Sequence, residues 1–591
     1  MILLHSANSY NAYGRRVVMK QFLAVAALDE TAVKQNEMLK NSHIYTEGFT
    51  VLRHEHMEFS VLVDGELYNQ RSLHEELQKA GFPKPAGLEE TVLYAYLLWG
   101  EKAMLHMEGA YSFLIQAKDS LFCAKDPLGL RPIYYLLADD CIWISSRIQT
   151  LLDAAKRKAV LDRSGILELF AFGPSISEDC TLYKDVSALP MGYLLRVSNT
   201  ELKVKQYYTL HALPHTDTLE ETLEKVHKLM SASIHAQADG AQASFLSGGL
   251  DSSLITSIAA NANPSWRTYS LDYEGNKENF KGNMYQVSMD TAFIQDMCAY
   301  CHCSHTPLMI TQQELCDLLE DAMAARETPG MADVDSSLLW LCQQVAEHEQ
   351  VILSGECSDE IFGGYPWFYR DELKDLDTFP WLRSTKERIS LLHPDLRELP
   401  FEDYIAKRYA QSIENIEFLD TDTEEDRRAR IHTVLCLHWF MQTLVTRQVC
   451  MGDAASLNIR APFANVKLLE YVYNIPWNMK FLQQEEKGIL RKAFEQELPE
   501  SVAHRKKNPF PKTHNPQYAE LISKRLRERY DDPKSPLHQL FDDAMLRKLI
   551  DSKGESFQLP WYGQLMSGPQ LLAYLYQIDR WIITKNITIE K

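Results

Sequence analysis

Several features that would assign this chain to a common class of protein are missing. No apolar run among its 591 residues reaches the roughly 18 that a membrane-spanning helix needs, and no charged-then-apolar export signal opens the sequence. Basic residues are outnumbered, 61 against 81 acidic ones, and the net charge of −20 argues against nonspecific binding to nucleic acid, which is a polyanion. We therefore expect a cytoplasmic protein with neither a membrane nor a nucleic-acid partner.

The cysteines of the sequence give little support for either a disulfide-stabilised fold or a zinc site. The chain has 11 cysteines, an odd number, and in a large protein without an export signal we expect them to be reduced. One group, Cys298, Cys301, Cys303 and His305, has the ligand types of a zinc site. No second ligand pair follows at the spacing of a zinc finger, so buried and turn thiols are the preferred interpretation, with metal binding as the alternative.

The phosphate loop G-x-x-x-x-G-K-S/T is also absent, but another glycine-rich segment, SGGLDSS, occupies residues 247–253. It follows a predicted strand at 243–246 and precedes a predicted helix. Two glycines let the backbone approach an anion closely, and hydroxyls with free amides at a helix N-terminus can bind it. Asp251 has the wrong charge for a phosphate unless Mg²⁺ lies between them. The pattern resembles the pyrophosphate loop of ATP pyrophosphatases. The nucleotide-binding residues predicted here are Leu246, Ser247, Gly248, Gly249, Asp251, Ser252 and Ser253.

The length predicts two or three domains. The first, residues 1–210, reads as short strands mixed with helices, with strands at 59–63, 111–115 and 133–137 and helices at 89–98 and 164–172. A polar stretch at 211–218 is the linker candidate. From 219 to 591 helices alternate with strands of a parallel sheet, at 267–271 and 351–354, and the chain after Pro380 is almost wholly helical, with helices at 431–449 and 569–581.

Motifs in both halves resemble the asparagine synthetase family over nearly the whole chain. They are DGELYN at 64–69, KDPLGLRPIYY at 125–135, SGGLDSS at 247–253 and SGECSDEIFGGY at 354–365. The resemblance implies a two-domain chain of the α/β and α+β classes. Its first domain would be an N-terminal-nucleophile (Ntn) glutaminase fold, an α/β sandwich. Its second would be an ATP-pyrophosphatase-type domain with a parallel sheet and a helical C-terminal part.

The first domain departs from the family where the family has its glutaminase groups. The family needs a cysteine at position 2, whereas this chain opens Met1-Ile2-Leu3-Leu4 and its first cysteine is Cys123. Asp64 replaces the asparagine that donates to the oxyanion, so an acceptor would face developing negative charge. Residues 88–91 (LEET) stand where the family has S-D-x-E, and the R-G-P-D and R-L-S segments are missing between 41 and 59. We expect an inactive domain kept as a structural partner.

The second domain keeps the family's nucleotide and metal residues. The resemblance implies that Asp251 and Asp359 hold Mg²⁺, since carboxylates from two separate loops suit this ion. It also implies that Leu271, Ser354 and Gly355 contact the adenosine of ATP. The cofactors expected are therefore ATP and Mg²⁺.

Two further residues match catalytic positions of the family. Lys507, in the run Arg505-Lys506-Lys507, stands where the family has a lysine that stabilises acyl transfer, and a solvated basic turn is the alternative. Glu356 occupies the place of a glutamate near the attacking amine and is a candidate general base. The substrate side differs, because residues 444–451 (LVTRQVCM) keep only Arg447 and Met451 of a charged family segment.

These observations predict an amide-forming ligase that adenylates a side-chain carboxylate, most like a lasso peptide cyclase (macrolactam synthetase). An amine on the same molecule needs no ammonia channel, which accounts for a decayed glutaminase pocket. An ammonia-dependent asparagine synthetase is the alternative, and an inert scaffold is a third interpretation. The substrate would be a peptide or small-molecule carboxylate, with a leader-peptide-binding protein and a protease of the same pathway as candidate partners.

Overall fold

The computed structural model describes residues 20–28, 30–39, 43–198, 201–280, 289–382, 384–557, 560–563 and 566–590. They fall into two compact units. The first unit contains the described residues up to Asp162 together with Ser177–Leu210, and the second contains Arg163–Ile176 and the chain from His211 onward. The expectation about a cysteine at position 2 concerns residues outside the described part.

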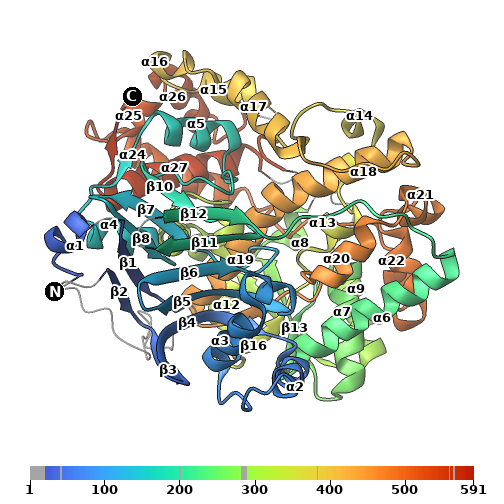
Figure 1. Ribbon diagram of the computed structural model, residues 1–591. Coiled ribbons are helices and arrows are strands. Elements are labelled where there is room, and N and C mark those ends of the chain that lie inside the picture. Colours follow the sequence, from blue (N-terminus) through green and yellow to red (C-terminus); the bar gives the residue numbers. More distant parts are fainter. Residues whose placement is uncertain are drawn as a thin grey trace. The chain divides into compact units, whose positions relative to one another are not determined.

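Two antiparallel sheets build the first unit (Figure 1). One has the strand order β10-β7-β8-β1-β2 and the other β12-β11-β6-β5-β4-β3. The strands are β1 (Leu23–Ala27), β2 (Ile44–Glu47), β3 (Thr50–His54), β4 (Met57–Leu67), β5 (Gly109–Ala117), β6 (Ser120–Lys125), β7 (Tyr134–Ala138), β8 (Cys141–Ser145), β10 (Val186–Ala188), β11 (Tyr193–Ser198) and β12 (Glu201–Gln206).

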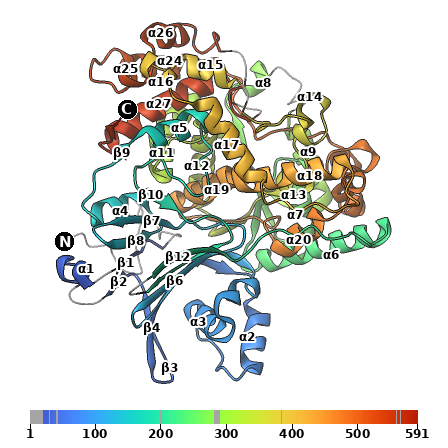
Figure 2. The same ribbon diagram turned by 45° about the horizontal axis from the view of Figure 1, so that its top comes forward.

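The alternation of side chains along β4 explains the layers of this unit. Leu62 packs with residues of the other sheet, such as Ile144, in a core between the two sheets. Its neighbours Val61 and Val63 point to the opposite face, because successive strand residues alternate. There they pack against α2 (Gln70–Lys79) and α3 (Leu88–Trp99), which Figure 2 shows beside β4. On the other sheet, α4 (Ile148–Ala154) contacts β7 and β8. This is the α/β sandwich that the family resemblance implied.

The second unit contains one five-stranded sheet in which every pair is parallel. Its order is β15-β14-β13-β16-β17, with β13 (Ala243–Phe245), β14 (Arg267–Tyr273), β15 (Ser304–Ile310), β16 (Val351–Leu353) and β17 (Asn458–Arg460). From β13 the chain moves outward in one direction and then returns to the other side at β16. The order therefore reverses between β13 and β16, and ligands of such sheets bind beyond the carboxyl ends of the strands at this switch point.

Helices lie on both faces of the parallel sheet. Ala243 packs in a core with α12 (Asp333–Val345) and α19 (Gln442–Ala455). Ser244, the next residue and hence on the opposite face, hydrogen-bonds Thr256 of α7 (Leu250–Ala262) at 2.8 Å. Alongside α7 lie α6 (Leu219–Ala238) and α9 (Thr291–Cys301). Further helices of this unit are α10 (Gln312–Asp317), α11 (Leu319–Arg326), α13 (Ser358–Phe362), α15 (Thr385–Ser390), α17 (Phe401–Ile413), α18 (Glu424–Leu435), α20 (Val466–Tyr473), α21 (Trp477–Lys480), α22 (Gly488–Ala493), α24 (Gln517–Tyr530), α26 (Asp543–Asp551) and α27 (Gly568–Thr584).

The structure corrects the sequence interpretation at one boundary. The helix expected at 164–172 is α5 (Arg163–Phe172), but it belongs to the second unit rather than to the first domain. Two helices of the second unit, α15 and α17, pack against it. Arg388 of α15 also donates to the carbonyl oxygens of Phe170 and Ala171, each at 3.1 Å. These partners lie more than 200 residues along the chain, beyond the reach of a local pattern.

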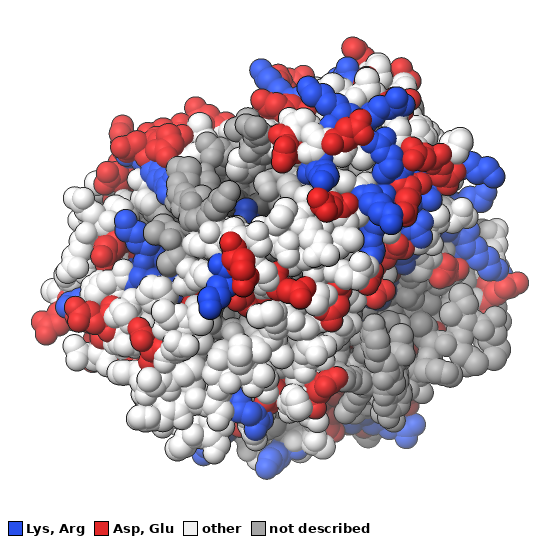
Figure 3. Space-filling view, turned by 180° about the vertical axis from the view of Figure 1, so that it is seen from behind, with Lys and Arg blue, Asp and Glu red and all other residues white. Residues whose placement is uncertain are grey.

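Two strands and the length of one helix were also missed. β15 is an edge strand with mostly exposed side chains, and β17 has only 3 residues, so neither shows an apolar pattern. The helix expected at 431–449 is longer, because α18 continues through a π-helical turn, Cys436–Met441, into α19. Among the described helices none is long and apolar enough to cross a membrane. Figure 3 shows acidic and basic side chains interspersed on one face.

Burial of Asp333 predicts a pH-dependent stability. Its carboxylate is 1% exposed, and burial raises its pKa to about 6, although Gln570 donates to it at 3.0 Å. A raised folded-state pKa means that stability is present below the unfolded value and is lost as pH rises through about 6. We expect Asp333→Asn, which stays neutral, to gain in melting temperature relative to wild type between pH 4 and 7. Exposed Asp371→Asn is the control, and parallel melting curves for both variants would refute the assignment.

Candidate active site

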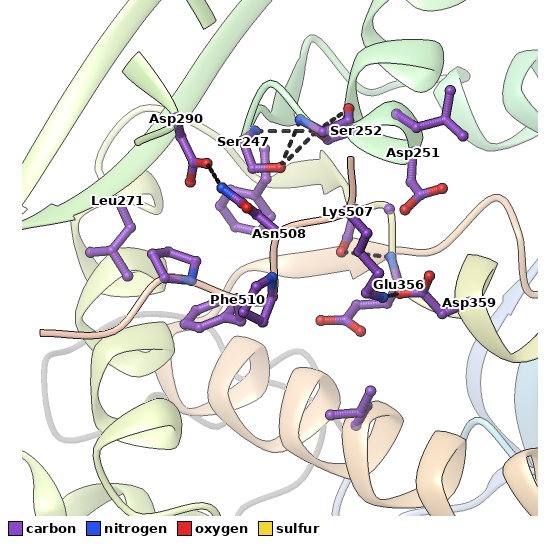
Figure 4. Close-up of a pocket in the computed structure, with 18 of the residues that line it drawn as sticks. Ser247, Asp251, Ser252, Leu271, Asp290, Glu356, Asp359, Lys507, Asn508 and Phe510 are labelled. Carbon is purple, nitrogen blue, oxygen red and sulfur yellow. Dashed lines mark hydrogen bonds and ion pairs between the residues drawn. The ribbon is translucent and has the colours of Figure 1, made fainter. Parts of the chain in front are cut away.

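A cavity of about 260 Å³ lies at the switch point of the parallel sheet. The loop after β13, residues 246–249, and the loop after β16, residues 354–357, both line it. In Figure 4, Leu271 and Phe510 lie toward one side of this cavity, and Asp251 and Asp359 lie toward the other. We call the end with Asp251 and Asp359 the charged end. The other end is more apolar, although Asp290 and its ion-pair partner Arg505 also line the cavity there.

The glycine-rich loop is shaped by Gly248 and by two hydroxyls. Gly248 has a φ of 66°, which favours glycine, and a Cβ there would lie 2.7 Å from Cβ of Phe293. The hydroxyls of Ser247 and Ser252 lie 3.1 Å apart, and the backbone amide of Ser247 donates to Ser252 Oγ at 3.2 Å. No side chain caps the N-terminus of α7. Its first amides are therefore free to bind an anion such as a phosphate.

The second loop fits closely against the first. A Cβ at Gly355 would lie 3.1 Å from Cβ of Asp251 and 3.1 Å from the amide nitrogen of Ser252. A side chain at this position would require these neighbouring atoms to shift by a few tenths of an ångström. The glycine thus sets how closely the first turns of α7 and α13 can approach.

The charged end is organised around Lys487, whose side chain is 3% exposed. Its Nζ lies 2.7 Å from both carboxylate oxygens of Asp251 and 2.6 Å from Oδ1 of Asp359. Ser358 Oγ donates to Asp251 Oδ1 at 2.6 Å and completes the cluster. Burial opposes the charge on Lys487, but the two carboxylates raise the pKa of the amine above its usual value. One buried ammonium therefore joins the first turns of α7 and α13.

Lys507 approaches the same cluster from another direction. Its Nζ pairs with Oδ2 of Asp359 and lies 4.4 Å from the centroid of the Tyr365 ring. Burial alone would raise the pKa of Asp359, but Lys487 and Lys507 together lower it to about 2. Asp359 is therefore ionised at any physiological pH and binds two lysines at once.

Gly364 leaves no free space behind this cluster. A Cβ built at Gly364 would overlap Oδ1 of Asp359 and Cε of Lys487. The backbone after α13 thus presses directly on the ion pair. A movement of the backbone at Gly364 would therefore displace the side chains of both Asp359 and Lys487.

Glu356 and Arg447 form a second charged pair on the cavity wall. Arg447 of α19 is 2% exposed and donates to Glu356 Oε1 at 2.6 Å. Its guanidinium carbon lies 4.7 Å from the centroid of the Phe510 ring. Glu356 is 22% exposed and so keeps access to the cavity. The surrounding wall is largely apolar and includes Met331, Val334, Leu338, Leu341, Phe440 and Leu444.

The residues at the charged end fit a magnesium ion in type. Asp251 and Asp359 supply carboxylate oxygens, which Mg²⁺ prefers, and it usually uses one or two such groups together with substrate phosphates. Among the described residues no group of three acidic, histidine or cysteine side chains could enclose a metal. The place between the two carboxylates is held by Lys487 Nζ, so the ion would be bound beside this lysine.

Most of the residues predicted from sequence meet in this cavity. Those that line it are Leu246, Ser247, Gly249, Asp251, Ser252, Leu271, Ser354, Gly355, Glu356, Asp359 and Lys507. Two members of the glycine-rich loop do not. Gly248 packs against α9, and Ser253 is fully buried behind the loop.

Sequence reasoning missed Lys487 altogether. It precedes a short helix in the run Lys487-Gly488-Ile489-Leu490-Arg491, which has no distinctive local pattern. Its partner Asp251 lies 236 residues away. No signal within the sequence window could have found it, because only folding brings the two together.

The possible zinc ligands serve other contacts. The ring nitrogens of His305 lie 3.0 Å from Thr268 Oγ1 and 3.0 Å from Ser270 Oγ. Both are thus engaged by hydroxyl groups rather than turned toward a thiol cluster. Cys298 and Cys303 lie close enough to interact, and a hydrogen bond from Cys298 lowers the pKa of Cys303 to about 7. None of the described cysteines forms a disulfide.

Asp64 in the first unit is withdrawn from solvent. Its carboxylate is 0% exposed and accepts a hydrogen bond from the Lys20 backbone amide at 2.9 Å. Burial raises its pKa, while the charge of Arg131 works in the opposite direction. Lys20 Nζ lies 2.5 Å from Glu89, one of the residues found where the family has S-D-x-E. At the position where the family resemblance implies an oxyanion-binding asparagine, this chain therefore has the buried carboxylate of Asp64, which is hydrogen-bonded within the protein.

Comparison with known proteins agrees with this geometry. The family described as asparagine synthase matches residues 225–582, and the family described as glutamine amidotransferase domain matches residues 44–208. Asparagine synthetase (glutamine-hydrolyzing) 3 of Bacillus subtilis (strain 168) is 38% identical over 545 residues, covering 90% of this chain and 88% of that protein. Asparagine synthetase (glutamine-hydrolyzing) 1 of the same organism is 27% identical over 506 residues, covering 78% and 77%.

A solved structure also matches part of the chain. Glutamine phosphoribosylpyrophosphate amidotransferase from B. subtilis covers 50% of this chain and 75% of its own, at 13% sequence identity. Its TM-score is 0.24, which is too low to establish a shared fold.

Proposed function

Since the chain belongs to the asparagine synthase family, we propose that it is an AMP-forming ligase that closes an amide ring within a peptide, as a lasso peptide cyclase does. The relatives support the broader statement that the protein is an ATP-dependent carbon–nitrogen ligase. The observation that carries the proposal is the meeting of Asp251, Asp359 and Lys487 beside the glycine-rich loop.

In the proposed reaction a carboxylate oxygen of the substrate attacks the α-phosphorus of ATP, and pyrophosphate leaves. The amine nitrogen then attacks the acyl carbon, AMP departs with the carboxylate oxygen, and the amine loses a proton. The free amides of α7, with Ser247 and Ser252, would bind the phosphates, while Lys487 and Lys507 would offset their charge. Mg²⁺, when bound by Asp251 and Asp359, would offset further charge on the triphosphate.

Glu356 is the proposed acceptor of the amine proton. It lines the cavity, and Arg447 holds one of its oxygens at 2.6 Å, so its position is defined. A base must come within hydrogen-bond reach of the proton that it removes. The carboxylate of Glu356 would meet this condition for an amine that enters the cavity from its more apolar end.

The nature of the cavity wall supports a peptide substrate. A site for free aspartate has to bind an α-amine and an α-carboxylate through fixed charges. Here two of the cationic side chains on the wall are engaged within the chain, Arg447 by Glu356 and Arg505 by Asp290, and the wall around Arg447 is mainly apolar. Such a wall suits an extended, mostly uncharged chain, and holding it folded back would bring the amine close to the acyl group. A leader-peptide-binding protein and a protease would then act in the same pathway.

The second candidate is ammonia-dependent synthesis of asparagine from aspartate. The names of the relatives favour it, since the protein that is 38% identical is an asparagine synthetase. The deciding experiment offers the purified protein ATP and Mg²⁺ with either aspartate plus ammonium or a candidate precursor peptide. A peptide product lighter by one water would support the cyclase, whereas asparagine without any dehydrated peptide would support the second candidate.

We also expect no hydrolysis of glutamine. The buried carboxylate of Asp64 would repel an oxyanion, and the side chain of Glu89 is tied to Lys20. Cys123 cannot substitute as nucleophile, because it is fully buried and its thiol pKa is raised by that burial. Glutamate release should therefore equal the enzyme-free blank. Release that disappears when Asp64 is replaced by alanine would contradict this expectation.

A further inference from the structure

A second cavity, of about 350 Å³, lies in the second unit away from the glycine-rich loop. Its walls come from α18, α21 and the segment at 213–215, and Figure 1 shows α18 and α21 near each other. Part of the wall is apolar, formed by Leu213, Pro214, Ile475, Pro476 and Trp477. Four charged side chains also line it.

Two of those four charges already neutralise each other. Arg430 donates to the two oxygens of Asp422 at 2.9 and 3.3 Å, and it also donates to Asn474 Oδ1 at 3.1 Å. This pair is therefore part of the wall. The other two charges, Lys480 and Asp426, lack such a partner.

Lys480 is a buried amine without a direct ion pair, although the carboxylates of Asp422 and Asp426 lie near enough to act on it. Its side chain is 2% exposed, and its Nζ makes no ion pair or hydrogen bond with any part of the chain that the structure describes. Burial, followed by the charge of Arg430, lowers the pKa of the amine to about 7, although the charges of Asp426 and Asp422 work in the opposite direction. A buried amine held without a partner is costly, and an anion beside it would remove that cost.

Asp426 carries the opposite charge on the same wall. Its oxygens accept from the backbone amides of Trp477 at 2.7 Å and Thr423 at 3.1 Å. Burial opposes ionisation, but the hydrogen bond from the Thr423 hydroxyl, the two backbone hydrogen bonds and the charge of Lys480 lower its pKa below the usual value. It forms no ion pair with any described residue. Its Oδ2 already accepts from both the amide and the hydroxyl of Thr423, whereas Oδ1 accepts only from Trp477 and can take a further hydrogen bond.

The contents of this cavity bear directly on the candidate active site. The ring of Trp477 packs against Gly363, where a Cβ would lie 2.7 Å from Cζ3 of the tryptophan. The next residue, Gly364, presses on the pair formed by Asp359 and Lys487. A ligand beside Trp477 is thus separated from the reactive cluster by two glycines.

We propose that this second cavity binds an amino acid as its zwitterion and that its occupancy changes the rate of the ligase reaction. The α-carboxylate pairs with Lys480, the α-ammonium pairs with Asp426, and the side chain of the ligand contacts the apolar wall. A plain anion would satisfy only Lys480, and a phosphate dianion would also face the negative charges of Asp422 and Asp426. The zwitterion supplies a direct partner to both charges at once.

The binding experiment is calorimetric titration of the full chain, without ATP, with each of the common amino acids. Butyrate and butylamine, which each carry one of the two charged groups, are titrated in parallel. We expect at least one amino acid to bind, and Lys480→Met to weaken it by at least about tenfold. Ala429→Leu, which fills the cavity, should abolish binding. The control is Lys228→Met, at an exposed lysine on α6, which should bind as wild type does.

Each outcome decides a part of the proposal. Absence of binding to the wild type, or binding that persists in both Lys480→Met and Ala429→Leu, would overturn it, and equal affinity for butyrate would overturn the role of Asp426. Melting curves check that the variants fold. Pyrophosphate release is then measured with and without the bound amino acid, and an unchanged rate would overturn the regulatory part. Since titration needs no ligase turnover, its failure is distinguishable from failure of the proposed function.

Discussion

Replacing Asp359 by asparagine should lower pyrophosphate release on the order of 10²–10³-fold. The substitution keeps the shape of the side chain but removes a charge that binds both Lys487 and Lys507. It also removes one of the two carboxylates expected to hold Mg²⁺ near the triphosphate. The measurement is pyrophosphate released per enzyme in the presence of ATP, Mg²⁺ and the carboxylate substrate.

Two companion variants sharpen this test. Asp251→Asn should lose a comparable factor, because Asp251 supplies the other carboxylate and contacts Lys487 through both oxygens. Asp371→Asn alters an aspartate whose side chain is 89% exposed, and it should behave as wild type. If Asp359→Asn and Asp251→Asn release pyrophosphate at the wild-type rate, neither carboxylate takes part in activation.

Lys487→Met is expected to be the most damaging single substitution. Without the ammonium, Asp251 and Asp359 face each other across a space that is closed from behind by Gly364. Breaking a buried ion pair by removing one partner destabilises a protein by about 3 kcal/mol or more, because the remaining charge stays uncompensated. We expect a lower melting temperature and a loss of at least about 10³-fold in pyrophosphate release.

Lys507→Met provides the informative comparison. Lys507 is 18% exposed and contacts only one of the two carboxylates, so its loss should cost less stability than the loss of Lys487, whose side chain is 3% exposed. If Lys507 acts on the acyl transfer step, Lys507→Met should keep ATP binding while slowing product formation. Lys492→Met, at an exposed position of α22, is the control for both. A larger loss in Lys507→Met than in Lys487→Met would reverse the order of importance inferred from burial.

The glycine-rich loop could be read from the sequence because its chemistry is local. The turn, the hydroxyls of Ser247 and Ser252 and the first amides of α7 all lie within a few consecutive residues. The same is true of the second loop at 354–357, where Ser354, Gly355 and Glu356 follow β16 directly. Short apolar strands flanked by such loops are visible as patterns, so both sides of the switch point were predicted.

The placement of α5 and β17 depends on segments that are distant in the sequence. The pattern of α5 shows a helix but not which core buries it, and its partners on α15 and α17 follow only after more than 200 residues. The strand β17 is 3 residues long and completes the sheet by pairing with β16. The sequence of these three residues does not predict a strand, because they become one only by pairing with the edge strand β16.

The sequence by itself determined that there are two domains, from length and a change of pattern. It also determined the glycine-rich loop and the carboxylates at 251 and 359, since each of these is encoded by neighbouring residues. Only the tertiary structure decided which cation these carboxylates share. Lys487 comes from a segment without a recognisable motif, and its charge matters because folding buries it between two carboxylates from different loops. The same holds for Arg447 against Glu356 and for Lys480, which is buried without a direct ion pair to any described residue. The strength of an electrostatic interaction and the pKa of a side chain depend on burial and on neighbouring charges. Both are properties of the fold and not of the local sequence.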